Sequence, residues 1–247
     1  MVDLICKFTY KLAKKIVVLS PGFKERLQDR GISAEKISVI HNWCNEPALE
    51  KYDESEVSLP NNGNLNLLFA GNLGHAQDLP SIIEAAKLAN LKLLNVNFVF
   101  LGDGVAKKDA QLKVMQSSLN NVFFLPRVPM NEVGSLLLQA DALLVHLKDD
   151  ELFRITIPSR TQANLAVGKP IIMAVSGDAA DLVSNSGGAI ICQPSEPNEL
   201  YNAVKKLSNL TQEELELMGA NSKEFYYAHL SLDQGVKKFV KLFEDIT

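Results

Sequence analysis

Residues 65–74 read Leu-Asn-Leu-Leu-Phe-Ala-Gly-Asn-Leu-Gly, and they give the clearest indication of the architecture. The first six form a nearly continuous apolar run, which predicts a strand that is buried on both faces. A turn containing Gly71 and Gly74 follows, and a helical pattern then covers residues 79–90. A buried strand, a turn and a helix in this order make up the repeating unit of a parallel sheet.

The same alternation continues along the chain on either side. Further strands are predicted at residues 16–19, 37–40, 96–101, 122–125, 142–147, 171–175 and 189–192. Helices are predicted to begin at Pro21 with Ser20 as the cap, to run to about residue 118 after Gly104, and to cover residues 131–139, 161–167, 178–185, 197–207, 211–228 and 231–245. Residues 148–160 are predicted to form a long turn. This pattern predicts an α/β fold, a Rossmann-like parallel sheet with helices on both faces.

Length and composition exclude several classes of protein. A chain of 247 residues with 47% hydrophobic content can form one large or two small domains, and its net charge of −4 is not typical of nucleic-acid-binding proteins. Cys6, Cys44 and Cys192 are far apart and odd in number, which fits neither a disulfide framework nor a closed zinc site. Cys192 follows an apolar run and is expected to act as a small buried hydrophobe. The histidines show no metal-site spacing, so no metal is expected.

No apolar segment approaches the roughly 20 residues that cross a bilayer, and no signal-peptide pattern is present. We therefore expect a cytoplasmic protein in a reducing compartment, with peripheral contact at the cytoplasmic membrane face left open.

Residues 43–64 contain Pro47, Pro60 and Gly63 and are predicted to be an irregular linker. Trp43, at the start of this segment, is expected to be a packing anchor.

In a parallel sheet, ligands bind beyond the carboxyl ends of the strands, so the loops there are the candidate site. They cover residues 71–78, 102–105, 126–129, 148–160 and 176–180. In the first loop, Gly71 and Gly74 let the backbone approach a ligand, and the amides of the next helix would suit a phosphate. A tight turn capped by Asp78 is the alternative. The spacing is neither that of a P-loop nor that of the dinucleotide fingerprint.

Residues 148–161 combine three acids with two arginines. Arg160 stands where a helix begins, which is unfavourable for the helix dipole unless an anion lies between its guanidinium and the helix amides. Arg154 is either a second phosphate ligand or a solvated surface charge. The acids at 149–151 fit a solvated turn better than a metal site. His146, in the preceding strand, is expected to be a core histidine.

Taken in order, these strand ends resemble the C-terminal half of a GT-B glycosyltransferase of family 4 (group 1), over nearly the whole chain. Residues 69–74 resemble the first strand and turn of the donor domain, and residues 98–104 resemble the F-x-G-x-G strand end. Residues 158–172 resemble the P-S-K…M-A-x-G-K-P-V-I segment. The Asn-Trp pair at 42–43 and the Pro-Ser-Arg-Thr-Gln-Ala run look most like bacterial surface-polysaccharide transferases, including N-acetyl-fucosamine transferases of O-antigen pathways.

This resemblance implies that residues 1–42 end an N-terminal acceptor domain, that residues 43–64 are a linker, and that residues 65–247 form a donor-binding domain with C-terminal helices. The rest of the acceptor domain, which would bind a lipid-linked saccharide, is expected to be missing, so the fragment alone would be inactive. The last helix would pack against that missing half. The implied reaction transfers a hexose or N-acetylaminosugar from a UDP-linked donor to a hydroxyl in bacterial polysaccharide biosynthesis, with no cofactor and no nucleic-acid partner.

By the same resemblance, the backbone at Gly71 and Gly74 approaches the diphosphate, Arg127 and Val128 lie by the base, and Arg160 replaces the P-S-K lysine. No catalytic residue is identified. The full set of expected donor-binding residues is Gly71, Asn72, Gly74, Gln77, Gly102, Gly104, Arg127, Val128, Lys148, Arg154, Ser159, Arg160, Thr161 and Gln162.

The sequence departs from the family pattern in two places. Asn72 and Gln77 stand where many members have an arginine and a lysine. The paired glutamates of the family fall on Ala163 and near Ile155, and Gln162 is expected to replace the ribose contact. Two alternatives therefore stay open: a GT-B-type nucleotide-sugar epimerase, which needs acids and bases at its cleft, and a non-catalytic nucleotide-binding module.

Overall fold

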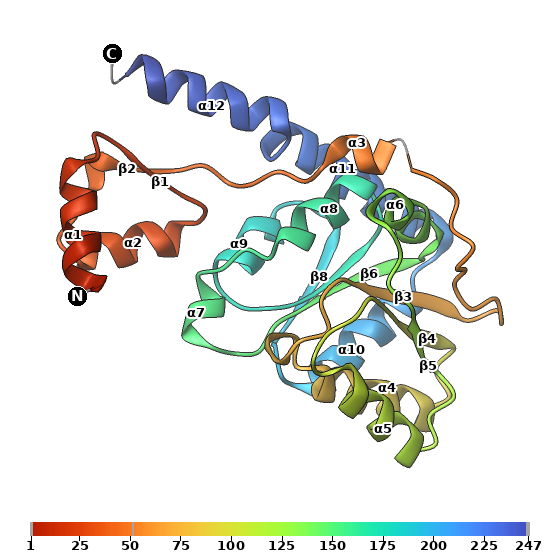
Figure 1. Cartoon of the computed structure of the whole chain (residues 1–247). Coiled ribbons are helices and arrows are strands. Elements are labelled where there is room, and N and C mark those ends of the chain that lie inside the picture. The colour runs from red at the N-terminus through yellow and green to blue at the C-terminus, as the bar shows by residue number, and fades with distance from the viewer. Residues whose placement is uncertain (1, 51, 246–247) are drawn as a thin grey trace.

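Six parallel strands form the central sheet of the computed structural model, which describes residues 2–50 and 52–245 (Figure 1). The strands lie in the order β5-β4-β3-β6-β7-β8, and each neighbouring pair is parallel. Their bounds are β3 Leu65–Ala70, β4 Val96–Leu101, β5 Val122–Leu125, β6 Ala142–His146, β7 Ile171–Ala174 and β8 Ala189–Cys192. The predicted parallel α/β sheet is confirmed.

Alternate residues of each strand supply the cores on the two faces of the sheet. Leu67, Phe69 and Phe100 belong to the core under one layer of helices, whereas Leu68 and Val99 belong to a core on the opposite face. This alternation follows from the two-residue period of a strand, and apolar residues at every position are what a sheet covered on both sides requires. Burial of the Cys192 thiol raises its pKa to about 12, as expected for a small buried hydrophobe.

Two layers of helices cover the sheet. One layer contains α4 Leu79–Leu91, α5 Lys107–Gln116 and α10 Pro197–Ser208. The other contains α6 Met130–Gln139, α8 Ser159–Val167, α9 Asp178–Ser184 and α11 Gln212–His229. Helix α11 begins with a capping box, in which Thr211 and Glu214 satisfy each other's backbone amides.

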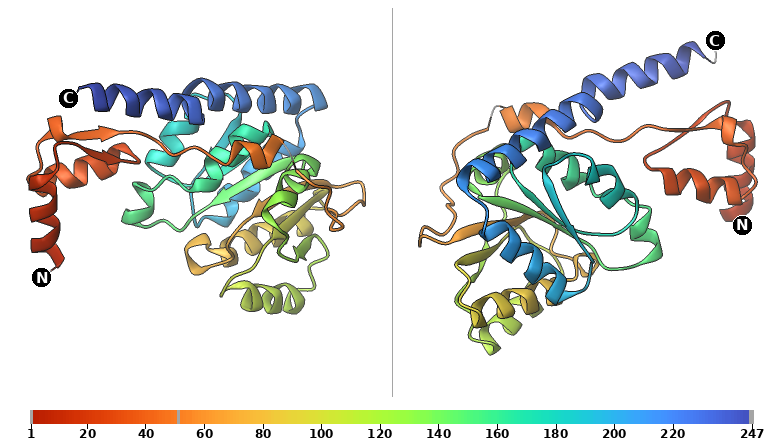
Figure 2. Two further views of the ribbon diagram at one scale, coloured as in Figure 1. Left: turned by 45° about the horizontal axis from the view of Figure 1, so that its top comes forward. Right: turned by 180° about the vertical axis from the view of Figure 1, so that it is seen from behind.

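The N-terminal residues form a small unit beside the main sheet (Figure 2). It consists of α1 Val2–Leu12, β1 Ile16–Val18, α2 Pro21–Asp29, the 3-10 turn η1 Ala34–Lys36 and β2 Ile37–Val39, with β1 and β2 parallel. Hydrogen bonds of the described residues that join it to the main body include the Ser20 hydroxyl, which donates to the Ile155 carbonyl at 2.6 Å, and the Gly22 amide, which donates to Asp178 Oδ2 at 2.7 Å. Ser20 also caps α2, as predicted.

The segment predicted to be an irregular linker contains a short helix, α3 Glu46–Glu50. This helix packs against α6 and α8, so the segment is partly docked on the sheet domain. The prediction was wrong here because a five-residue helix containing Pro47 has no helical periodicity of its own. Hydrogen bonds of Glu46 join this helix to α11 and to the start of the last helix: its Oε1 accepts from the Tyr226 hydroxyl and the Leu232 amide, each at 2.8 Å.

The last helix, α12 Leu232–Glu244, runs from α11 past α3 toward the side of the N-terminal unit (Figure 2). Trp43 packs on it: a Cβ at Gly235 would collide with the indole ring, and the Phe239 ring meets the indole edge-on at 6.5 Å. The expected packing role of Trp43 is thereby confirmed. Val236 and Val240 on the same helix are exposed.

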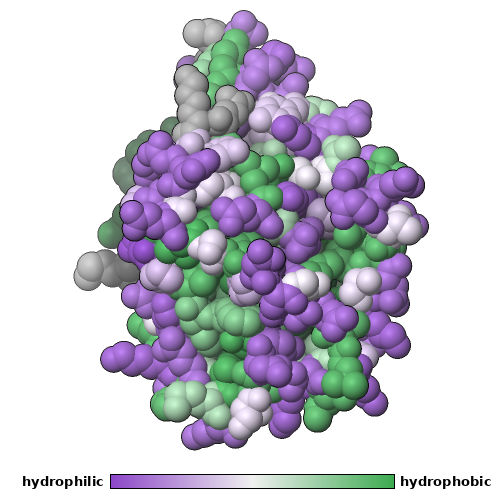
Figure 3. Space-filling model, turned by 90° about the vertical axis from the view of Figure 1, so that its right-hand side faces the viewer, coloured by the Kyte–Doolittle hydropathy of each residue, from purple (hydrophilic) through white to green (hydrophobic). Residues whose placement is uncertain are grey.

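The surface carries mixed side chains. On the side of the molecule seen in Figure 3, hydrophilic and apolar groups are interspersed. None of the helices in the described part of the chain has both the length and the apolar character needed to cross a bilayer.

Candidate functional site

A cavity of about 660 Å³ opens at the carboxyl ends of β3, β4 and β5, beside the start of α8. Six of the fourteen predicted donor-binding residues line it. They are Gly71, Asn72, Gly102, Arg127, Val128 and Arg160. The cavity therefore lies where ligands bind in parallel α/β sheets, and it joins Arg160 to the glycine turn after β3.

The two glycines on the floor of the cavity allow two loops to approach each other. The Gly71 amide donates to the Leu101 carbonyl at 2.9 Å, and a Cβ at Gly102 would collide with the Gly71 carbonyl oxygen. Gly71 and Gly102 have φ of +135° and +136°, a region that side chains strongly disfavour. Glycine at both positions thus keeps the backbone exposed to the cavity.

Arg160 supplies the positive charge of the site. It lies in the first turn of α8, and its Nη2 is 3.4 Å from the position that a Cβ of Gly71 would occupy. Its guanidinium carbon lies 4.2 Å from the centroid of the Phe69 ring, in a cation–π contact. Its Nη1 is buried without a hydrogen-bond partner among the described residues. Burial lowers the pKa of Arg160 to about 10, so the side chain remains charged at neutral pH.

An anion would satisfy this arrangement. A buried cation without a counter-charge is costly. Phosphate oxygens accept hydrogen bonds from guanidinium nitrogens and also from the backbone amides at a helix N-terminus. The alternative for the first loop, a tight turn capped by Asp78, agrees with the structure in position: Asp78 is the N-cap residue of α4, and its carboxylate accepts from the Ser81 hydroxyl at 2.7 Å and not from a backbone amide.

One wall of the cavity is apolar. It starts at Val128 after β5 and continues through Pro129 into α6, with Met130, Val133 and Leu137. Arg127 stands at the rim and is exposed. A flat aromatic heterocycle would bury its faces against such a wall, because apolar walls with a few polar groups are typical of small-molecule sites.

Three predicted residues shape the glycine turn but do not line the cavity. Gln77 is buried, and its Oε1 accepts from the Gly74 amide at 3.0 Å. A Cβ at Gly104 would collide with the Leu73 carbonyl oxygen, so this glycine allows the loops after β3 and β4 to pack together. The structure gives Gly74, Gln77 and Gly104 roles inside the loops and not at the cavity surface.

The residues after Pro158 divide in the same way. Ser159 is exposed, and Thr161 and Gln162 are buried away from the cavity. The amide nitrogen of Gln162 faces the Pro158 and Ser159 carbonyls at 3.0 Å each. The expectation that Gln162 replaces the ribose contact is therefore not supported, because its amide is occupied within the first turn of α8.

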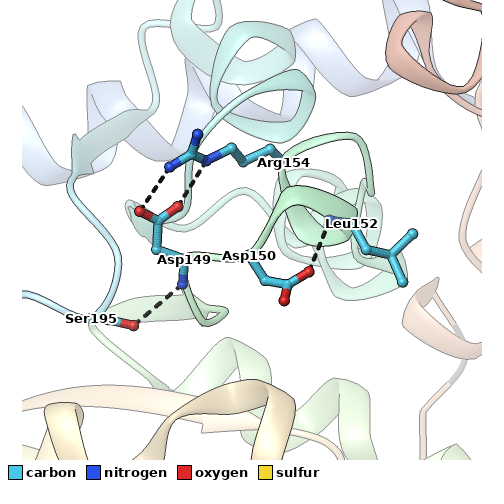
Figure 4. Close-up of polar contacts among 5 residues, drawn as sticks. All are labelled: Asp149, Asp150, Leu152, Arg154 and Ser195. Atoms are coloured by element: carbon cyan, nitrogen blue, oxygen red, sulfur yellow. Dashed lines mark hydrogen bonds and ion pairs between the residues drawn. The ribbon is translucent and has the colours of Figure 1, made fainter. Parts of the chain in front are cut away.

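Lys148 and Arg154 also lie outside the cavity. Arg154 donates from Nε and Nη2 to the two carboxylate oxygens of Asp149, each at 2.9 Å, on the short helix α7 Glu151–Arg154 (Figure 4). This pairing lowers the pKa of Asp149 and raises that of Arg154. Asp150 caps α7 by accepting from the Leu152 amide at 2.9 Å. The geometry thus supports the surface-charge interpretation of Arg154 and not the phosphate one.

Residues 148–160 are not one long turn, because α7 interrupts them. In the described ranges, no cluster of three or more histidines, cysteines, aspartates or glutamates is arranged to hold a metal ion. Of the acids at 149–151, Asp149 pairs with Arg154, Asp150 caps α7, and Glu151 is the first residue of α7.

His146 lies beneath the first loop, at the end of β6. It is fully buried, and its Nδ1 lies 3.0 Å from the Gln77 carbonyl, as expected for a core histidine. Burial lowers its pKa to about 4. The neighbouring Asp78 is half-buried; burial raises its pKa, but hydrogen bonds with Ser81 and Ser195 outweigh that effect and the net pKa is lowered.

Sequence reasoning missed part of the cavity lining. The apolar residues of α6 and the pair Ala163–Asn164 of α8 line it alongside the predicted ones. A signal for the pair was available, because residues three and four positions after Arg160 share its face of a helix. Nothing in the sequence marked α6 as a cavity wall.

Comparison with known proteins gives a consistent result. The family model described as glycosyl transferases group 1 matches residues 50–225. An uncharacterized glycosyltransferase of Methanocaldococcus jannaschii is 24% identical over 241 residues, covering 98% of this chain and 62% of that protein. The Escherichia coli K12 protein WcaI, provisionally named a colanic acid biosynthesis glycosyl transferase, is 25% identical over 194 residues, covering 74% of this chain and 46% of its own length. This chain thus spans only about half to three fifths of these two relatives.

Solved structures share the fold. The crystal structure of Anabaena Alr3699/HepE in complex with UDP-glucose superimposes with a TM-score of 0.78 at 14% identity, covering 99% of this chain and 68% of that one. A glycosyltransferase from Rickettsia africae has a TM-score of 0.77 at 17% identity, over 97% of this chain and 66% of that one. Since the family model covers well over half of the residues, the chain belongs to the glycosyl transferases group 1 family.

Proposed function

We propose that this chain binds a UDP-linked sugar and supplies the donor site of a glycosyltransferase that acts in polysaccharide biosynthesis. Family membership supports a transferase. Anabaena HepE has been solved with UDP and glucose and with UDP-glucose, and the name of WcaI refers to colanic acid biosynthesis. These properties belong to the relatives, and their transfer to this chain is the proposal.

The observation that carries the proposal is the buried, unpartnered Nη1 of Arg160 beside the Gly71 backbone. The charge lies between the backbone of the glycine turn after β3 and an apolar wall. A nucleoside diphosphate has the matching parts, with a doubly charged end for Arg160 and a flat base for the wall at Val128. Other anions would use Arg160 but leave the wall empty.

The chemistry that this arrangement serves is displacement at the anomeric carbon. The bond from that carbon to the diphosphate oxygen breaks, and its electron pair stays on the leaving UDP. A bond forms to the acceptor hydroxyl, whose proton is released. Because negative charge grows on the diphosphate as the bond breaks, Arg160 and the α8 amides would stabilise the transition state more than the bound donor.

The rest of the proposal concerns the whole protein. Residues 65–247 would be the donor domain, residues 43–64 the connection and residues 1–42 the end of an acceptor domain that binds a lipid-linked saccharide at the cytoplasmic membrane face. On this assignment, the fragment alone would not turn over. A bacterial O-antigen pathway and an N-acetyl-fucosamine donor remain the more specific form of the prediction.

Calorimetric titration tests the donor site. UDP is expected to bind the wild type, and Arg160→Ala is expected to weaken binding by about 100-fold, because a charge-assisted bidentate contact contributes about 2–3 kcal/mol. Arg154→Ala is the matched control: it removes another arginine of the same segment, one that is paired with Asp149 outside the cavity. Its affinity should equal that of the wild type. GDP in place of UDP reports base preference.

An unchanged affinity in Arg160→Ala would remove the phosphate assignment, and no binding of any nucleotide would remove the donor site altogether. A non-catalytic nucleotide-binding module is favoured by one observation, that Ala163 places no carboxylate on the cavity wall. Sugar transfer by a protein with the acceptor domain restored separates the two. Turnover with a lipid-linked acceptor supports the transferase, and nucleotide binding without turnover supports the module.

A further inference from the structure

We infer that the exposed dipeptide Asn62–Gly63 is a site of spontaneous covalent modification, at which the side-chain amide of Asn62 is lost and an aspartyl or isoaspartyl residue forms. The dipeptide directly precedes β3 and therefore lies at the amino ends of the strands, away from the cavity at their carboxyl ends. The inference is thus independent of the proposed donor function. It assigns a modification site to the segment that connects the N-terminal unit to the sheet domain.

The surroundings of this dipeptide leave the reacting atoms accessible. Asn-Gly occurs once in the sequence, and both residues are exposed. The amide nitrogen of Gly63 makes no hydrogen bond to another described residue. Apart from the neighbouring residues, no atom lies within 4 Å of the position that a Cβ of Gly63 would occupy. Because glycine has no side chain, this nitrogen can approach the Asn62 side chain without steric hindrance.

The reaction requires only the chain and water. The Gly63 amide loses its proton to solvent, and its nitrogen attacks the side-chain carbonyl carbon Cγ of Asn62. A bond from this nitrogen to Cγ forms, the bond from Cγ to Nδ2 breaks, and the leaving nitrogen takes up a proton and departs as ammonia. Water then opens the succinimide ring. Opening at the side-chain carbonyl gives aspartate, and opening at the main-chain carbonyl gives isoaspartate, in which the chain continues through Cγ.

The buried side chain of Asn97 slows this reaction. Asn97 lies in β4 and is fully buried; its Nδ2 donates to Asn62 Oδ1 at 2.8 Å, and its Oδ1 accepts from Asn62 Nδ2 at 3.2 Å. The Asn64 amide also donates to Asn62 Oδ1, at 3.2 Å. Rotation of the Asn62 side chain toward the Gly63 nitrogen breaks these hydrogen bonds, which has a free-energy cost. The unfolded chain, which lacks them, should therefore react faster than the folded protein.

The modification would in turn weaken the hold of Asn97 on the segment. Both products carry a carboxylate and no side-chain amide at position 62, so the donor that faces Asn97 Oδ1 is lost. Asn97 keeps its hydrogen bonds with Asn64 Nδ2 at 3.1 Å and with Asn66 Oδ1 at 2.9 Å. We therefore expect the modified protein to remain folded and to melt at a lower temperature than the unmodified protein.

Peptide mapping by mass spectrometry tests the inference on the whole chain. The folded wild type is incubated at mildly alkaline pH, which favours deprotonation of the Gly63 amide, and a protein isoaspartate methyltransferase serves as the probe for isoaspartate. Position 62 is expected to show the mass of an acid in place of an amide and to accept methyl groups. Asn61 is the matched internal control, since it is an exposed asparagine of the same segment that precedes asparagine and not glycine.

The same incubation of Asn62→Gln and of the wild type in guanidinium chloride completes the test. Asn62→Gln keeps an amide but would have to close a larger ring, so modification at this position should be lost. Denaturant removes the contacts of Asn97 without a substitution, and position 62 should then react several-fold faster. No modification of the folded protein at position 62, or equal conversion at Asn61, would overturn the site. Equal rates in the folded and unfolded wild type would overturn the role of Asn97.

Discussion

Arg160 shows how a single residue can reveal a site. A cation at the first turn of a helix interacts unfavourably with the helix dipole. This interaction can be predicted from the sequence, because the prediction requires only the helix boundary and the residue type. The structure adds the stacking on Phe69 and the unpartnered Nη1, which no local pattern encodes.

Gln162 shows the opposite outcome. The helix face of Arg160 continues through Ala163 and Asn164, so residue 162 falls on another face, and counting helical positions would have excluded it. Gln162 was predicted from the chemistry of its side chain, and the helix face on which that side chain lies was not considered. Residue type therefore placed Arg160 correctly at the cavity but misplaced Gln162.

The burial of His146 makes stability depend on pH. Its pKa is about 4 in the folded protein and near 6.5 in the unfolded chain, so between these values the unfolded chain binds more protons. The free energy of unfolding should therefore decrease as pH falls, by about 2 kcal/mol from pH 7 to pH 4.5 for this group.

Urea unfolding at several pH values measures this effect. His146→Gln keeps a donor for the Gln77 carbonyl but does not titrate, so its unfolding free energy should decrease less over the same range. Parallel pH profiles for the two proteins would show that another group causes the loss.

At the scale of single elements, long strands and helices were predictable and short helices were not. The strands of the main sheet are apolar at nearly every position, which is a strong signal. Helix α3 has five residues and packs on α6 and α8, whereas α7 has four residues, with Phe153 packed against the core. Helices this short gain little from local propensity, so a local pattern cannot reveal them.

Helix α3 depends on the hydroxyl of Tyr226 in α11. This hydroxyl donates to Glu46 Oε1 at 2.8 Å and accepts from the Cys44 amide at 3.2 Å. Burial and the hydrogen bonds with the Cys44 and Glu46 side chains hold the pKa of Tyr226 well above its usual value. Tyr226→Phe should lower the free energy of unfolding by about 1–2 kcal/mol, because Glu46 and the Cys44 amide each lose a hydrogen bond. The rate of amide hydrogen exchange should increase more in α3 than in the strands of the main sheet.

Tyr201→Phe is the control for this change, since it removes a hydroxyl from a half-buried tyrosine of α10 that makes no hydrogen bond in the described part of the chain. It should leave both stability and exchange in α3 unchanged. Equal effects of the two substitutions would mean that the Tyr226 hydroxyl does not hold α3.

At the scale of the whole molecule, Gly22 and Asp178 form one of the contacts between the N-terminal unit and the main body. The Gly22 amide donates to Asp178 at 2.7 Å, and a Cβ at Gly22 would collide with the Ile155 side chain. Asp178→Ala removes the charged acceptor, and trypsin should then cut α2, which carries Lys24 and Arg26, several-fold faster, because a lost charge-assisted bond shifts such a contact by about 1–2 kcal/mol.

Asp181→Ala provides the comparison, because Asp181 is an exposed acid in the same first turn of α9. It should leave the cutting rate at the wild-type value. Small-angle scattering should show a larger radius of gyration for Asp178→Ala alone, and an unchanged radius in both variants would show that this bond does not hold the unit.

Within residues 2–50 and 52–245, the residues that line the cavity lie between positions 70 and 164, so the N-terminal unit and the C-terminal helices contribute no side chain to it there. One continuous part of the chain therefore supplies the lining of the cavity. On the proposed function, a chimera that joins residues 65–247 to a foreign amino-terminal half should take its nucleotide preference from this chain and its acceptor preference from the foreign half. Donor and acceptor preference could then change independently in evolution.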